Sequence, residues 1–154
     1  MSIPERWKGF KPLPPDIEER LQRLTPLFER EGVRLAYLFG SLNNPKGDRA
    51  PNDVDLALLT SGTSALDLWV PISEALGTER LDIANLRIES PLNRFEILRT
   101  GRPLYVADAD EQQRWEMATI REYQDTAYLR RKQGEYLRRS IKQWVSTGIP
   151  SKRA

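Results

Sequence analysis

The chain has 154 residues, 30% of them charged and 39% hydrophobic, which suits one water-soluble domain with a real core. It contains no cysteine and no histidine, so catalysis by a thiolate or an imidazole is excluded, as are zinc sites built from those side chains. We find neither an apolar run of membrane-span length nor a signal-peptide pattern, so we expect a cytoplasmic location and no membrane partner. Any chemistry must therefore depend on carboxylates, metal ions or lysine.

Helical and extended patterns alternate through the first two thirds of the chain. Apolar spacing predicts helices over 16–31, from Ser64 or Asp67 to Leu76, and over 91–100. It predicts strands over 33–39, 53–59, 80–86 and 104–107, the last at a sheet edge. Pro26 and Pro71 are expected to kink or split the first two helices, and Gly32, Gly77 and Gly101 to end the three helices. This order predicts an α+β (α/β-like) domain with a small mixed β-sheet and flanking helices.

The C-terminal part carries no strand signal, and its apolar spacing predicts a helical extension over 110–147. An unbroken helix of this length would be about 55 Å long, more than the width of such a domain, so either Gly134 breaks it or it projects. Residues 121–154 include nine basic and three acidic residues, giving net +6 against −4 for the remainder. Such a tail suits nucleic acid or an acidic protein face, or it is a solvated helix face. Nucleic acid therefore remains an open partner.

Two acidic residues stand at alternate positions of the second predicted strand. Asp53 and Asp55 lie on one face of an extended chain, with Cα atoms about 6.5–7 Å apart. Carboxylates at that spacing can converge on hard cations between them, and ligands that offer only oxygen favour magnesium over zinc. This pattern predicts a magnesium site, with a charge pair of no function as the alternative.

A glycine and a serine follow the first predicted strand, and eleven residues separate Ser41 from Asp53. Gly40 allows backbone N–H groups to approach an anion, and Ser41 offers a hydroxyl donor to phosphate oxygens. Lys46 and Arg49, in the loop between the two motifs, are weaker candidates for phosphate contacts. The combination of metal ligands with phosphate donors predicts a nucleotide triphosphate site.

These residues resemble the motif of the minimal nucleotidyltransferases (MNT) of the DNA polymerase β-like superfamily. The motif reads Gly40-Ser41, a linker of eleven residues, then Asp53-Val-Asp55-Leu. The third carboxylate of the family comes from a later strand, and Asp82 in the run Arg80-Leu-Asp-Ile-Ala-Asn is the match. The linker is the main departure, because it contains two prolines and has Asn52 where the family often has serine.

The resemblance implies a polymerase β-like fold, with Asp53, Asp55 and Asp82 as catalytic metal ligands and Gly40 and Ser41 at the nucleotide. It implies two Mg²⁺ ions, ATP as substrate, and transfer of AMP to a tyrosine of a HEPN ribonuclease toxin, which makes the protein an antitoxin. The partners would be that toxin and ATP, in a homo-oligomer or hetero-oligomer.

Two other functions stay open: a small-molecule nucleotidyltransferase of the aminoglycoside type, and a non-catalytic antitoxin or binding module that acts by occlusion. We expect a single nucleotidyltransferase domain over 1–154, with a catalytic core at about 16–108.

Overall fold

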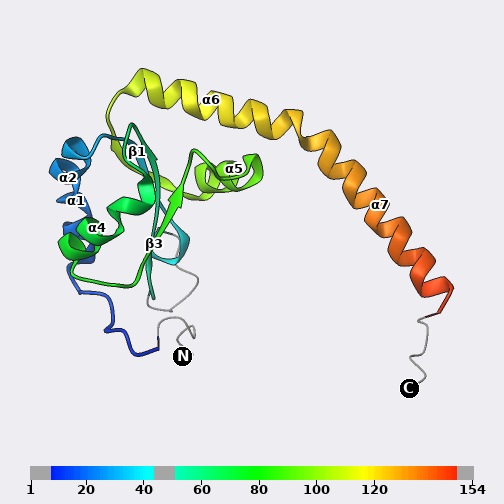
Figure 1. The fold of residues 1–154 in the computed structure, drawn as a ribbon, viewed down its shortest axis with the longest axis horizontal. Coiled ribbons are helices and arrows are strands. Elements are labelled where there is room, and N and C mark those ends of the chain that lie inside the picture. Colours follow the sequence, from blue (N-terminus) through cyan, green and yellow to red (C-terminus); the bar gives the residue numbers. More distant parts are fainter. Residues whose placement is uncertain (1–7, 44–50, 149–154) are drawn as a thin grey trace.

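A computed structural model describes residues 8–43 and 51–148 of the chain. Its centre is a sheet of four strands in the order β3-β2-β1-β4 (Figure 1). The strands are β1 (Val33–Phe39), β2 (Val54–Thr60), β3 (Leu81–Asn85) and β4 (Arg102–Val106). Strand β1 pairs antiparallel with β2 and β4, whereas β2 and β3 are parallel. The predicted small mixed sheet is confirmed, and β4 lies at its edge as expected, beginning two residues earlier than predicted.

The first predicted helix is split into α1 (Ile17–Gln22) and α2 (Thr25–Arg30). Pro26 lies in the first turn of α2, where its missing N–H costs no helical hydrogen bond. Gly32 follows with φ of +71°, a conformation that ends the helix before β1. The expectation that proline divides this segment is confirmed.

The remaining helices of the body begin and end close to the predicted residues. A 3₁₀ turn, η2 (Ala65–Leu68), leads into α4 (Trp69–Leu76), and Gly77 ends α4 with φ of +68°. Helix α5 (Pro91–Thr100) has the predicted bounds because the Ser90 hydroxyl accepts a hydrogen bond from Asn93 N at 3.1 Å.

Helices cover both faces of the sheet (Figure 1). One face packs against α1, α2, η2 and α4, and the other against α5 and α6 (Ala109–Asp125). The side chains of β1 and β2 alternate between these two cores, which explains why both strands are almost continuously apolar. The first core contains Phe28, Leu38, Leu56, Leu58, Ile72 and Leu76, and the second contains Leu35, Tyr37, Ala57, Leu59, Leu86 and Ile97.

The C-terminal region forms two helices, α6 and α7 (Ala127–Ser146), which meet at Thr126. The Thr126 hydroxyl donates to the carbonyl oxygens of Glu122 at 2.9 Å and Tyr123 at 3.1 Å, a bonding pattern that bends helices. Gly134 lies inside α7 and does not break it, so of the two predicted outcomes the projecting helix is the one observed. Figure 1 shows α7 extending away from the body. None of the helices in the described ranges is long and apolar enough to cross a membrane.

A stack of side chains fixes the point from which α7 leaves the body. The Phe95 ring of α5 lies against the Tyr123 ring of α6 with centroids 3.8 Å apart. The Arg130 guanidinium lies 4.1 Å from the centroid of the same Tyr123 ring, and its Nη2 donates to Tyr123 O at 2.7 Å. Arg94 pairs with Glu122 beside this stack, at 3.0 Å. The direction of α7 therefore depends on contacts with α5.

Tyr37 joins the centre of the sheet to α6. Its ring is 1% exposed and lies against Trp115, and its hydroxyl donates to Glu116 Oε1 at 2.7 Å. Burial, and then the bond to Glu116, raise the pKa of Tyr37 above its ordinary value. Folding therefore favours the protonated phenol.

Replacement of Tyr37 by phenylalanine tests this link. The stability from Tyr37 is fully present below its ordinary pKa of 10.0 and is lost as pH rises above it. We expect Tyr37→Phe to lower the free energy of unfolding by about 1 kcal/mol at neutral pH, and the difference to shrink in strong alkali. Urea unfolding of both proteins over a pH series measures this. A difference that does not change with pH would contradict it.

Candidate active site

Three carboxylates meet at one end of the sheet, where β1 ends and β2 and β3 begin. Asp53 lies directly before β2, Asp55 is its second residue, and Asp82 is the second residue of β3. Asp55 and Asp82 are paired neighbours in the parallel ladder, so their side chains project on the same face. Each of the three carboxylates has an oxygen within 4.8 Å of the others. The predicted acidic group is therefore brought together by the fold.

Gly40 makes room for one of these carboxylates. It follows β1 with φ of +73°, and a Cβ atom at this position would lie 2.0 Å from Asp55 Oδ2. It begins the short helix α3 (Gly40–Asn43), which is held in place because Asn43 Nδ2 donates to Thr100 O at 2.7 Å. A side chain at Gly40 would displace Asp55, so the glycine is required for the position of this carboxylate.

Ser41 acts on a second member of the acidic group. Its hydroxyl donates to Asp53 Oδ1 at 3.2 Å, and Asp53 is only 7% exposed. A hydroxyl has one proton to donate. A hydrogen bond from the Ser41 hydroxyl to a phosphate would therefore replace the bond to Asp53, unless the phosphate is bound by backbone N–H groups instead. In the structure Ser41 positions Asp53.

Arg80 is a positioning residue that the sequence did not single out. It is 4% exposed, and its guanidinium donates to Asn52 O at 3.2 Å and to Phe10 O at 2.8 Å. Its own carbonyl accepts from Val54 N at 2.8 Å, so the residues on both sides of Asp53 are bonded to Arg80. The sequence gives only a weak signal for this role, an arginine directly before an apolar strand. Only the fold brings Arg80 against the residues on either side of Asp53.

Three other polar residues of the sheet ends serve the fold. Arg87 donates to Thr60 O at 2.7 Å, at the opposite end of β2 from Asp55. Arg102 pairs with Glu18 at 2.7 Å, and Tyr105 packs on the ring of Phe28. The candidate phosphate contacts Lys46 and Arg49 lie outside the described residues.

The acidic group has the composition of a magnesium site. Its donors are all carboxylate oxygens, which suit hard cations, and two of them lie on adjacent strands whose backbone hydrogen bonds fix their positions. Carboxylates this close repel one another when ionised, and a bound cation offsets that repulsion. The residues present therefore fit a divalent metal ion.

The family model described as "Polymerase beta, Nucleotidyltransferase" matches residues 22–110, more than half of the chain. The chain therefore belongs to this nucleotidyltransferase family. The matched range contains all four strands and all three carboxylates. A search of curated proteins gave no match.

Solved structures share the fold over most of the chain. One is the tri-AMPylated Shewanella oneidensis HEPN toxin in complex with MNT antitoxin, with 20% identity, 79% of this chain and 98% of that chain covered, and a TM-score of 0.61. A toxin–antitoxin structure with AMP-PNP has 21% identity, coverages of 77% and 97%, and a TM-score of 0.62. The MntA-HepT toxin–antitoxin structure has 19% identity, coverages of 78% and 97%, and a TM-score of 0.60. These similarities confirm the predicted polymerase β-like fold.

Replacement of Gly40 by alanine tests the close approach of Asp55. The added Cβ would push the Asp55 carboxylate away, so we expect at least a tenfold loss of Mn²⁺ affinity, measured by electron paramagnetic resonance, in a protein that still folds. Gly62→Ala is the matched control, because Gly62 has φ of +85° and nothing within 4 Å of the added Cβ. Both variants bear the strain of the left-handed conformation, about 1–2 kcal/mol. Equal metal affinities in the two variants would contradict the assignment.

Proposed function

We propose that this protein is a magnesium-dependent nucleotidyltransferase that transfers AMP from ATP to a tyrosine hydroxyl of a HEPN-type toxin, and so acts as an antitoxin. The observation that carries the proposal is the meeting of Asp53, Asp55 and Asp82 beside the Gly40 turn. Family membership supports the reaction class. The similar solved structures support the substrate and partner, since they include a tri-AMPylated HEPN toxin and a complex with AMP-PNP.

In the proposed reaction the tyrosine oxygen attacks the α-phosphorus of ATP. The bond from this phosphorus to the bridging oxygen breaks, and pyrophosphate leaves. Asp53 and Asp55 would hold two magnesium ions, which supply charge neutralisation at the phosphates. Asp82 completes the ligand set or accepts the proton of the hydroxyl. The backbone at Gly40 and Ser41 binds phosphate oxygens.

Removal of one carboxylate tests the reaction. Asp55→Asn keeps the size of the side chain but removes its charge, so we expect AMP transfer to fall by at least a hundredfold while the fold is retained. Asp67→Asn is the matched control, because Asp67 is an exposed residue of η2. Intact-mass spectrometry of a co-expressed HEPN-type partner, incubated with ATP and magnesium, measures the added AMP. Retained transfer in Asp55→Asn, or tight binding of the partner without any added AMP, would overturn the proposed reaction.

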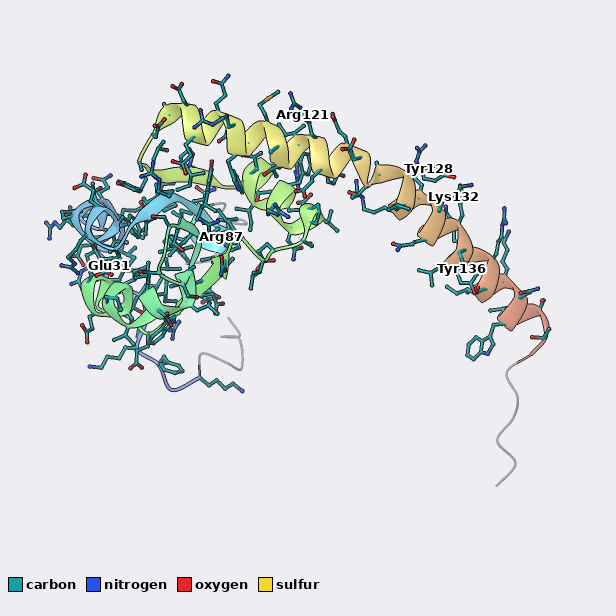
Figure 2. All side chains as sticks on the ribbon, turned by 45° about the horizontal axis from the view of Figure 1, so that its top comes forward. Glu31, Arg87, Arg121, Tyr128, Lys132 and Tyr136 are labelled. Atoms are coloured by element: carbon teal, nitrogen blue, oxygen red, sulfur yellow. The ribbon has the colours of Figure 1, made fainter. Side chains whose placement is uncertain are left out.

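Helix α7 is the surface best suited to the partner. Figure 2 shows Tyr128, Lys132 and Tyr136 along α7, away from the sheet and the other helices. The helix has no buried residue although it is 20 residues long. Its large apolar side chains are more than half exposed: Tyr128, Leu129, Tyr136, Leu137, Ile141, Trp144 and Val145.

The charge of α7 indicates what kind of surface it contacts. The helix contains six basic residues and one acidic residue, Glu135. Leu137, Ile141 and Val145 follow at intervals of four and share a face. Two copies of so basic a helix would repel each other, whereas an apolar groove bordered by acidic residues on the toxin would complement it. We therefore assign the apolar face of α7 to such a groove.

Charged substitutions on α7 test the partner surface. The double variant Leu137→Asp, Ile141→Asp should weaken toxin binding at least tenfold and leave Mg²⁺-ATP binding unchanged. The control is Leu66→Asp, Val70→Asp, since these side chains are equally exposed, at 56% and 57%, but lie on the body. Fluorescence titration of the purified toxin measures both. If both double variants bind the toxin like the original chain, the contact lies elsewhere.

A further inference from the structure

A cavity of about 310 Å³ lies beside the acidic group, on the same face of the sheet. The register of the strands locates it, because Phe39, Asp55 and Asp82 form a row of neighbours across β1, β2 and β3. Ala84 follows Asp82 by two residues and shares its face. Phe39 and Ala84 both line the cavity. The cavity therefore borders the row that contains two of the three carboxylates.

Helix α5 forms the opposite wall. Asn93, Glu96 and Thr100 line the cavity from this helix, at helical spacing along one face, and Glu89, which precedes the helix, lines the cavity beside them. The carbonyl of Thr100 is the group that accepts the hydrogen bond from Asn43 in α3. The end of α5 is thus bonded to the end of α3, the short helix that begins with Gly40 and Ser41.

The polar groups of the cavity suit a neutral ligand that donates hydrogen bonds. Asn93 Nδ2 donates to Glu89 Oε2 at 3.0 Å, and Arg99 pairs with Glu96 at 2.7 Å. The hydrogen bond from Arg99 lowers the pKa of Glu96, so this carboxylate is ionised at neutral pH. Each of the two carboxylates, Glu89 and Glu96, can accept a hydrogen bond from an amino group.

We propose that this cavity binds the nucleobase of the nucleotide substrate. The assignment rests on the proposed nucleotidyltransferase function and adds the place where the base is recognised. The Phe39 ring offers an apolar surface for a planar heterocycle, Ala84 leaves room beside it, and Asn93, Glu89 and Glu96 face the edge of the ring with one amide and two carboxylates. The volume is at the lower end of the range for small-molecule sites, about 300–1,000 Å³.

The connection to α3 explains how one ligand spans the two parts of the site. Triphosphate oxygens would lie at the Gly40-Ser41 turn and the three carboxylates, where the metal ions supply positive charge. The base would then lie on the α5 side, where Glu89 and Glu96 can accept hydrogen bonds from amino groups. Metal ions at one end and hydrogen-bond acceptors at the other would give the nucleotide one orientation.

Filling the cavity tests the proposal in the full-length protein. Binding of ATP and of inorganic tripolyphosphate, each with Mg²⁺, is measured by isothermal titration calorimetry. The original chain should bind ATP at least tenfold more tightly than tripolyphosphate. Ala84→Leu should remove this difference by weakening ATP alone, while Ala118→Leu, an exposed alanine on α6, should change neither affinity.

Asn93→Leu supplies a second variant that does not depend on the core, because Asn93 is exposed on α5. It should reduce the preference for ATP over CTP and UTP to less than twofold, with tripolyphosphate binding unchanged. If ATP binding is intact in both variants but AMP transfer is lost, the cavity holds the acceptor side chain and the base assignment is overturned, although the enzyme function stands. If the original chain binds neither ligand, the proposed function fails as well.

Discussion

Three carboxylates with oxygens within 4.8 Å of one another repel when ionised, and much of the structure around them holds them in place. The parallel pairing of β2 and β3 sets Asp55 beside Asp82. Ser41 donates to Asp53, and the absence of a side chain at Gly40 leaves room for Asp55. The two helix layers stabilise the sheet that makes this possible, since β1 and β2 are buried on both faces. A divalent cation is the natural compensation for such an arrangement.

The same end of the sheet combines two kinds of polar surface. The acidic group suits cations, whereas the wall of the cavity, with Glu89 and Glu96, suits neutral groups that donate hydrogen bonds. Both parts connect to α3, through Gly40 at its start and Asn43 at its end. A nucleotide also has a charged and a neutral end, so it matches both parts of the proposed site.

Helix α7 presents a different physical situation from the body. Burial of apolar surface stabilises the body, while α7 exposes apolar side chains along its whole length. Its starting direction is nevertheless defined, because Arg130 lies over the ring of Tyr123, which is stacked on Phe95 of α5. A helix that is held at its first turns and exposed beyond them is suited to bind a partner. Helix α5 contacts the start of α7 and also lines the cavity, so it links the two.

The sequence by itself determined the elements and the identity of the acidic residues. Local signals were strong there: Pro26 divided α1 from α2, Gly101 ended α5, and the alternation of Asp53 and Asp55 placed both on one face. Long-range contacts were decided only by the tertiary structure, because no local pattern encodes which strand lies beside which. The pairing of Asp55 with Asp82, the bonds of Arg80 beneath the Asp53 loop, and the α5 wall all depend on such contacts. The position of the bend in the C-terminal helices also depends on tertiary contacts. It lies at Thr126 and not at Gly134, since a glycine breaks a helix only where packing requires another conformation.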